Sequence, residues 1–217
     1  MFFVFLKNKV APNTGVKLKS LSIKYNRSGS ERDMVFKNDS LNYGLISVIF
    51  HWLIVVGVFG LFGLGLWMDD LTYYDSWYKT APDLHRSFGV IVVSLMVLRL
   101  VWRLVNPAPK ALPTHSLLER RAAHIAHAFL YVLVISMFFT GYLITTAKGQ
   151  ALYVFDVISL PAIVTDVEGL EDLAGEIHEW IAFTIIAIVG LHIAGALKHH
   201  FKDKDKTLIR MLGIKGQ

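Results

Sequence analysis

The 217-residue chain contains no cysteine. Without thiolates it cannot hold an iron–sulfur cluster, attach haem covalently through a CxxCH motif or form disulfides. The sequence also has no glycine-rich phosphate loop, no GxSxG nucleophile elbow and no HExxH zinc motif. These absences exclude several familiar routes to redox and hydrolytic chemistry.

Charged residues are scarce as well, at 18% of the chain against 54% hydrophobic residues. Four apolar runs of 20 to 26 residues are broken only by isolated polar side chains. About 20 apolar residues in a helix cross the hydrocarbon layer of a membrane, which is roughly 30 Å thick. We therefore expect an all-α fold, an integral membrane four-helix bundle, with spans at Ile46–Trp67, His85–Leu104, Ala122–Ala147 and Ile177–Leu197.

Lysine and arginine are distributed unevenly between the segments that flank these runs. Eight basic residues precede the first run and six follow the fourth, while Lys110, Arg120 and Arg121 lie between the second and third. The other two loops hold ten acidic residues against Lys79 and Lys148. Because cytoplasmic loops carry the excess of basic residues, we predict that both termini are cytoplasmic. The net charge of +5 then favours anionic membrane lipid and gives no reason to expect nucleic acid.

The chain divides into three parts on this basis. Residues 1–42 are assigned to a cytoplasmic N-terminal tail, 43–200 to the transmembrane domain and 201–217 to a basic cytoplasmic C-terminal tail. Residues 1–33 are polar and basic without a long apolar run, so we expect them to be disordered. The opening MFFVFL is too short for the core of a signal peptide, and Met34 is an equally good candidate for the first translated residue.

Two histidines, His178 and His192, lie fourteen residues apart in the fourth run. In a helix they are about 21 Å apart along the axis and on nearly the same face. Given the predicted topology, His51 lies at the depth of His192, and His85 at the depth of His178. A single histidine on an apolar face is more often a packing residue. Two depth-matched pairs, one inner and one outer, favour a functional role, because an imidazole in hydrocarbon needs a partner.

Facing imidazoles in a helical bundle can bind the iron of a haem from both sides. One zinc ion cannot bind all four histidines, since the two pairs are about 20 Å apart and zinc ligands lie within about 2.1 Å of the metal. Two separate zinc sites would have only two histidines each. Haem needs no more than two, so the pattern favours one haem at each pair.

Several residues near the pairs are candidates for contacts with the haem. Gly89 and Gly195 lie on the helix faces of the adjacent histidines and leave room for a macrocycle, although glycines also serve helix packing. Arg86 at the outer end is either a partner for a propionate or a snorkelling residue. Ala151–Val164, apolar but too short to span, is expected to form an outer flap over the outer haem. The two interpretations of Arg86 also apply to three basic residues at the inner end: Lys198, Arg120 and Arg121.

Short motifs surround these histidines. They are SVIFHW at His51, DLHRSFG at His85, HIAHAFLY at His124 and His127, EIHEW at His178, GLHIAGALKHH at His192 and the tail FKDKDKTLIRM. In this order and spacing they resemble the bacterial cytochrome b561 family of di-haem, quinone-linked membrane proteins, over nearly everything from Tyr43 to Met211. The resemblance implies two haem b groups whose axial ligands are His51, His85, His178 and His192.

The remaining histidines have weaker assignments. His124 and His127 are the alternative ligands for the inner haem, but they open the third run at a slightly shallower depth, so we assign them to positions beside the haem or a quinone. His199 and His200 are placed either to donate to a quinone carbonyl or simply to be solvated. His115 lies in a proline-bordered loop and is assigned no role.

Two haems at different depths would carry electrons across the membrane. We expect ubiquinone as the substrate near the inner haem and a second partner near the outer one, in a multi-pass protein of the bacterial inner membrane. The resemblance implies, for some members of the family, that this partner is superoxide, whereas the acidic outer loops oppose the approach of an anion. Two other functions stay open: a haem b anchor that relays electrons from a separate dehydrogenase, and a histidine-lined metal or proton transporter.

Overall fold

The computed structural model describes residues 36–214 of the chain. Within this range four long helices form most of the structure: α2 (Leu45–Asp69), α3 (Thr80–Val105), α4 (Leu117–Thr146) and α5 (Leu170–Phe201). Each is long and apolar enough to cross a membrane, which confirms the predicted four-helix membrane bundle. The predictions made for residues 1–33 and for Met34 concern positions outside the described residues.

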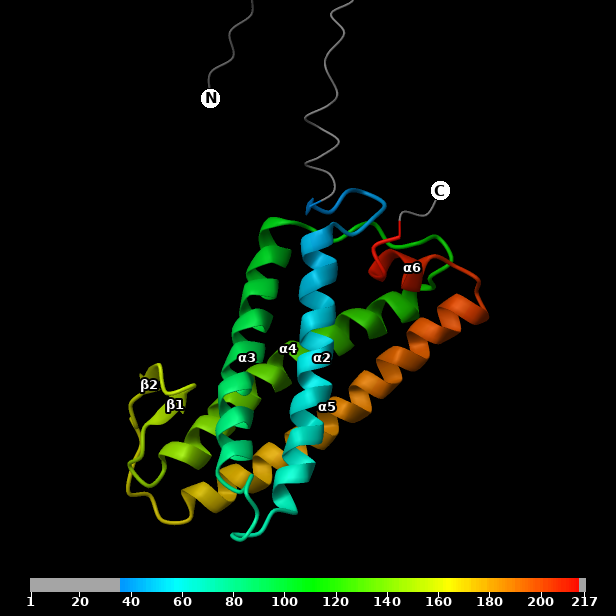
Figure 1. Ribbon diagram of the computed structural model, residues 1–217. Coiled ribbons are helices and arrows are strands. Elements are labelled where there is room, and N and C mark those ends of the chain that lie inside the picture. Colours follow the sequence, from blue (N-terminus) through cyan, green and yellow to red (C-terminus); the bar gives the residue numbers. More distant parts are fainter. Residues whose placement is uncertain (1–35, 215–217) are drawn as a thin grey trace, which may run out of the picture.

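The four helices form two helical hairpins. Figure 1 shows α2 running beside α3, and α4 running beside α5. At Gly57, α2 approaches α3 so closely that a Cβ atom would lie 2.5 Å from Val92 Cγ2. Most other large apolar side chains on the helices are at least partly exposed, as expected where lipid surrounds a bundle. One buried residue from each helix meets in the middle: Ile54, Met96, Val134 and Ile185.

A short β-hairpin lies between α4 and α5. Strand β1 (Leu152–Val154) pairs antiparallel with β2 (Ile158–Leu160). The turn between them holds Phe155 and Asp156 at positive φ angles of 50° and 57°. The hairpin packs against the start of α3, where the Phe155 N–H donates to Ser87 Oγ at 2.9 Å. The segment expected to form a flap is thus a hairpin that is anchored to α3.

The opposite end of the bundle is covered by the two ends of the described chain. Residues 36–42, placed in the N-terminal tail from sequence, turn against the loop after α3, where Asn38 Nδ2 donates to the carbonyl oxygen of Asn106 at 3.2 Å. The C-terminal segment forms helix α6 (Thr207–Met211) and folds back onto the bundle. Trp52 Nε1 on α2 donates to the carbonyl oxygen of the last α6 residue at 2.8 Å.

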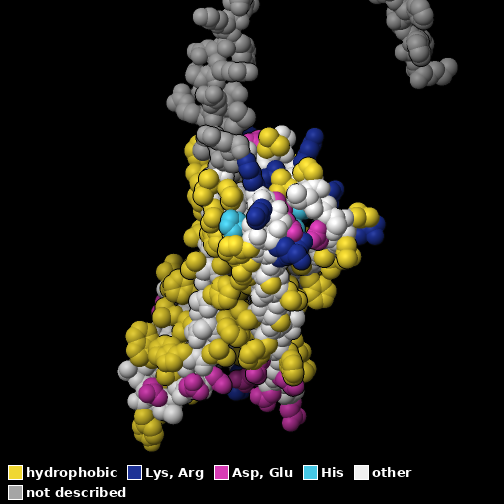
Figure 2. Space-filling model, turned by 90° about the vertical axis from the view of Figure 1, so that its right-hand side faces the viewer, with side chains coloured by type: hydrophobic (Ala, Val, Ile, Leu, Met, Phe, Trp, Pro, Cys, Tyr) yellow, Lys and Arg dark blue, Asp and Glu magenta, His cyan; other side chains and the backbone are white. Residues whose placement is uncertain are grey.

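Charge is separated along the axis of the bundle. In Figure 2 lysine and arginine side chains gather at the end where the described chain begins and ends, and aspartate and glutamate side chains gather at the other end. The β-hairpin lies at the acidic end (Figure 1). We call the basic end inner and the acidic end outer. The location of the inner end in the cytoplasm stays a prediction from this charge distribution.

Candidate functional site

Two pairs of imidazole rings face one another between the helices, one pair toward each end of the bundle. At the inner end the ring centroids of His51 on α2 and His192 on α5 are 6.5 Å apart, with an interplanar angle of 65°. At the outer end the centroids of His85 on α3 and His178 on α5 are 6.2 Å apart, with an angle of 61°. The structure brings together both predicted pairs, in nearly the same geometry.

These separations fit two imidazoles that bind one metal ion from opposite sides. A bond from an imidazole nitrogen to a transition metal is about 2 Å long, and the nitrogen is about 1 Å from the ring centroid, so the two centroids lie roughly 6 Å apart. All four histidines are partly buried, as ligands of a cofactor between helices should be. The spacing of both pairs is therefore suited to the iron of a haem.

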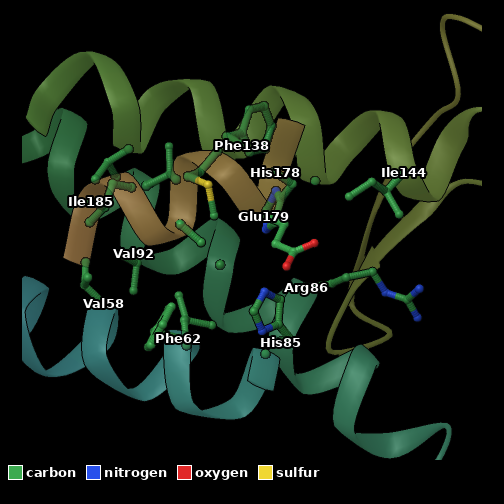
Figure 3. Close-up of a pocket in the computed structure, with 18 of the residues that line it drawn as sticks. Val58, Phe62, His85, Arg86, Val92, Phe138, Ile144, His178, Glu179 and Ile185 are labelled. Atoms are coloured by element: carbon green, nitrogen blue, oxygen red, sulfur yellow. The ribbon is translucent and has the colours of Figure 1, made fainter. Parts of the chain in front are cut away.

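The outer pair opens onto a cavity of about 570 Å³ between the helices. This volume is within the range of cofactor pockets, about 300–1,000 Å³. Figure 3 shows His85 and His178 extending toward each other from opposite sides of the cavity, with Val92 and Ile185 among the apolar side chains around them. Leu152 of β1 also lines it, so the β-hairpin covers part of the cavity. A mostly apolar lining limits the access of water and suits a flat, largely apolar macrocycle.

Each ring of the outer pair packs against a glycine on a neighbouring helix. A Cβ atom at Gly65 on α2 would lie 3.4 Å from His85 Cε1, and one at Gly141 on α4 would lie 3.3 Å from His178 Cε1. Neither glycine could be recognised beside its histidine in the sequence, because each lies on a different helix from the ring that it contacts. Their role depends on which helices are neighbours, which no local sequence pattern shows.

Thr140 on α4 determines the orientation of the His178 ring. Its Oγ1 lies 2.9 Å from His178 Nδ1, and 3.2 and 3.1 Å from the carbonyl oxygens of Ser136 and Met137. The single hydroxyl proton is donated to a carbonyl, so the hydroxyl oxygen accepts from the Nδ1–H. His178 Nε2 then carries the lone pair that a metal requires. Thr140 is a third residue of the site that the sequence pattern did not indicate.

Arg86, Gly89 and Gly195 were also predicted from the sequence to contact haem. Arg86 directs its guanidinium away from His85 and His178 in Figure 3, and Glu179 directs its carboxylate toward the cavity. Gly89 lines the cavity, with open space where a Cβ atom would lie. At the inner end, Gly195 likewise has no atom within 4 Å of the position where a Cβ atom would lie. The haem contacts assigned to Arg86 and to both glycines stay predictions. His85 Nδ1 is buried without a hydrogen-bond partner among the described residues.

Two basic side chains at the outer end are paired with carboxylates. Arg86 forms an ion pair with Asp83, and Lys148 forms one with Glu171. The hydrogen bond to Glu171 and the negative charge of that carboxylate raise the pKa of Lys148. Acidic side chains outnumber basic ones at this end, so the electrostatic field there repels an approaching anion.

A third imidazole lies beside the inner pair. The His127 ring centroid is 5.3 Å from that of His192, shorter than the His51–His192 separation of 6.5 Å. His127 Nδ1 donates to the Ala123 carbonyl oxygen at 2.7 Å, which leaves Nε2 with its lone pair. His124, the other histidine of this motif, is exposed and donates from Nδ1 to its own helix. Of the two alternative ligands, only His127 is placed beside the inner pair.

Arg99 contacts His51 and determines which nitrogen of the His51 ring carries the proton. Arg99 Nη2 is 3.3 Å from His51 Nδ1. A guanidinium can only donate hydrogen bonds, so His51 Nδ1 accepts in this contact and Nε2 carries the proton. Iron ligation by His51 Nε2 therefore requires this contact to open, whereas His127 needs no such change. The 6.5 Å separation between the His51 and His192 rings favours His51 as the second ligand. The present tautomer of His51, with the proton on Nε2, favours His127 instead.

His199 faces a polar cluster instead of the inner histidine pair. Its Nδ1 lies 2.8 Å from Asp203 Oδ2 and 3.2 Å from Asp205 Oδ2, and its ring centroid is 4.3 Å from that of His115. Lys198, a candidate propionate partner, forms ion pairs with Glu119 and Asp203. Arg120, another candidate, donates to the His115 carbonyl oxygen at 3.0 Å.

Four membrane-length helices with paired imidazoles along the bundle define the class of helical membrane cytochromes. The prokaryotic cytochrome b561 family matches residues 42–213, and the chain belongs to this family. It is thus an electron-transfer protein, multi-pass in a bacterial inner membrane, from a family that typically binds haem b.

Relatives with curated names agree with this assignment. The chain is 45% identical over 180 residues to cytochrome b561 homolog 2 of Escherichia coli K12, an alignment that covers 83% of this chain and 96% of the relative. It is 29% identical over 171 residues to a protein of Yersinia pestis named probable superoxide oxidase CybB, covering 78% and 95%. Cytochrome b561 homolog 1 of Escherichia coli K12 is 27% identical over 137 residues, covering 63% and 77%.

Proposed function

We propose that the chain is a di-haem b-type cytochrome that carries electrons across the bacterial inner membrane, with both termini in the cytoplasm. His51 and His192 would hold the inner haem, and His85 and His178 would hold the outer haem. The observation that carries the proposal is the near equality of the two centroid separations, 6.5 and 6.2 Å, at two depths of one bundle. Packing alone gives no reason for this equality.

Haem, when bound, supplies one-electron oxidation and reduction at each pair. The residues of the chain hold and orient the ligands. Thr140 keeps the proton of His178 on Nδ1, and Gly65 and Gly141 allow the two outer rings to pack closely against the helices. The apolar lining of the outer cavity limits contact with water, which helps to set the haem reduction potential.

We place ubiquinone near the inner pair, on the side of His127 and His199, and superoxide at the outer end. The name of the Yersinia pestis relative supports superoxide as the outer partner. In the proposed reaction two superoxide anions each lose one electron and become O₂. One ubiquinone gains these two electrons together with two protons and becomes ubiquinol. The chain is then a superoxide:ubiquinone oxidoreductase.

A haem b anchor that relays electrons from a separate dehydrogenase is the second candidate. The acidic outer end favours it, because carboxylates there repel the superoxide anion, and Arg86 is already paired with Asp83. A docked protein subunit, unlike a diffusing anion, does not depend on attraction to a single exposed cation.

The purified chain separates these functions in one set of measurements. We expect two low-spin haems per chain in the reduced-minus-oxidised spectrum, rapid haem reduction by a superoxide source without a second subunit, and reoxidation by added ubiquinone. Haem that stays oxidised under superoxide but is reduced by a co-purifying dehydrogenase would favour the anchor. A chain without haem would overturn the proposal in favour of a histidine-lined transporter.

Orientation is tested separately with reporter fusions. A reporter placed after Gln217 should be cytoplasmic, and one inserted near Asp75, between α2 and α3, should be external. The opposite result would exchange the sides on which ubiquinone and the second partner react.

A further inference from the structure

A cluster of metal-ligating side chains lies at the inner end, away from both histidine pairs. His115 belongs to the loop before α4, His199 to the last turns of α5, and Asp205 to the turn between α5 and α6. Their ligand atoms all lie within 4.8 Å of one another. The loop before α4 therefore meets a C-terminal segment that follows it by about 90 residues, although no role was predicted for His115 from the sequence.

The nitrogen–oxygen distances in this cluster fit a tetrahedral metal ion. His115 Nε2 and His199 Nδ1 each lie 3.2 Å from Asp205 Oδ2. The ring centroids of the two imidazoles are 4.3 Å apart, so the rings must separate to about 5 Å when both bind one ion. Ligands bound to zinc at 2.0–2.2 Å in tetrahedral geometry are about 3.3–3.6 Å from one another. The two nitrogen–oxygen separations are thus close to the value that a shared metal requires.

Burial and unmet hydrogen bonding at His199 point to the same conclusion. His199 Nδ1 is buried, and although two carboxylates lie near it, neither meets it in hydrogen-bond geometry. Its side chain is 13% exposed and that of Asp205 is 4% exposed. A buried nitrogen without a hydrogen bond carries a free-energy cost, which a metal bond would remove.

The neighbouring polar groups leave these three residues as the preferred ligands. Glu119, His199 and Asp203 also lie close enough together to hold a metal. Lys198 forms ion pairs with both Glu119 and Asp203, so an ammonium already occupies that side of the cluster. On the other side, Asp205 Oδ2 accepts from the Thr114 hydroxyl at 3.0 Å, which orients the carboxylate toward the imidazoles.

We propose that His115 Nε2, His199 Nδ1 and an Asp205 carboxylate oxygen bind a divalent transition-metal ion such as Zn²⁺. Two imidazoles and one carboxylate are a ligand set for zinc and similar ions and are unsuited to Mg²⁺ or Ca²⁺, which prefer oxygen ligands. The fourth position is open to water, or to Thr207 Oγ1, which lies 3.0 Å from His115 Nε2. The bound ion would tie the C-terminal segment to the loop before α4. The site includes none of the four paired histidines, so it does not depend on haem.

The test is zinc binding to the purified, haem-loaded full chain, measured by equilibrium dialysis and by calorimetry. We expect one tightly bound Zn²⁺ per chain, with no comparable binding of Mg²⁺. His115→Gln and Asp205→Asn should each weaken zinc binding at least tenfold. His124→Gln is the matched control, since it removes an exposed histidine at the same end, and it should bind zinc as the parent does.

A second measurement needs no variant. Zn²⁺, but not Mg²⁺, should slow tryptic cleavage after Lys202 and Lys204, because the metal holds this segment against the bundle. Zinc affinity that is equal in the parent, His115→Gln and Asp205→Asn would overturn the proposal, as would an unchanged cleavage rate in the parent. An unaltered haem spectrum in each variant shows that the bundle is still folded.

Discussion

Thr140 Oγ1 accepts a hydrogen bond from His178 Nδ1 at 2.9 Å, and the two residues come from the adjacent helices α4 and α5. This contact joins the packing of the bundle to the chemistry of the outer site. It selects the tautomer in which Nε2 can bind a metal, and it restrains rotation of the ring.

Replacing Thr140 with valine keeps the shape of the side chain and removes the hydrogen-bond acceptor. Loss of such a partner typically costs 10–100-fold in metal affinity or activity. We therefore expect Thr140→Val to weaken retention of the outer haem by about that factor and to shift its reduction potential, as measured by a redox titration of the haem absorbance. Thr184→Val on α5 is the control, because that hydroxyl is exposed and bonds only to its own helix. Identical titrations for both variants would contradict the role assigned to Thr140.

The packing of the outer rings leads to a second prediction. A methyl group at Gly65 or Gly141 would lie 3.4 or 3.3 Å from the adjacent imidazole carbon, so each ring must move by a few tenths of an ångström. We expect Gly65→Ala and Gly141→Ala to loosen the outer haem and to leave the inner one unchanged, as measured by loss of haem absorbance on heating. Gly63→Ala, where nothing lies within 4 Å, should behave as the parent does. An equal loss in all three variants would show that contact with the imidazole rings is not the cause, and helix propensity would not explain it either, because alanine has a higher helix propensity than glycine.

These two cases also show what could be predicted from the sequence. The depths of His51, His85, His178 and His192 follow from their positions in apolar runs, because each residue advances a helix by 1.5 Å. Both pairs could therefore be expected before any packing was known. Thr140 contacts a ligand from another helix, and the rotation of one helix against another depends on side-chain packing that a single sequence does not reveal.

The same limit applies to the two smaller features of the fold. The segment Ala151–Val164 could be recognised as too short to span, but its contact with Ser87 on α3 could not be predicted. His115 was assigned no role because its partners, His199 and Asp205, are about 90 residues away in the sequence. Local patterns carry no information on such contacts.

A third prediction decides between His51 and His127 at the inner end. The centroid separation of 6.5 Å from His192 suits His51 as the second ligand, whereas the 5.3 Å separation of His127 is short for an intervening iron. We expect His51→Ala to remove about half of the haem, measured as the haem-to-protein ratio, and His127→Ala to retain both haems. Arg99→Gln should not lower the haem content, since iron ligation requires Arg99 to leave His51 Nδ1. The reverse pattern, with haem lost from His127→Ala alone, would make His127 the ligand.

The ion pair between Arg86 and Asp83 gives two substitutions with opposite expected effects on the reaction with superoxide. Arg86 is adjacent to His85, but Asp83 neutralises its charge. Surface charges act over about 8 Å at physiological salt, so charges close to the entrance of the outer cavity matter most. We therefore expect Arg86→Gln to slow haem reduction by superoxide a few-fold at low salt, and Asp83→Asn to accelerate it by a similar factor. Stopped-flow absorbance under a calibrated superoxide source measures both rates.

Both differences should shrink as salt is raised, and a neutral reductant should reduce all three proteins equally. If Asp83→Asn and Arg86→Gln change the rate in the same direction, electrostatic steering is not the cause, and the case for the dehydrogenase anchor becomes stronger.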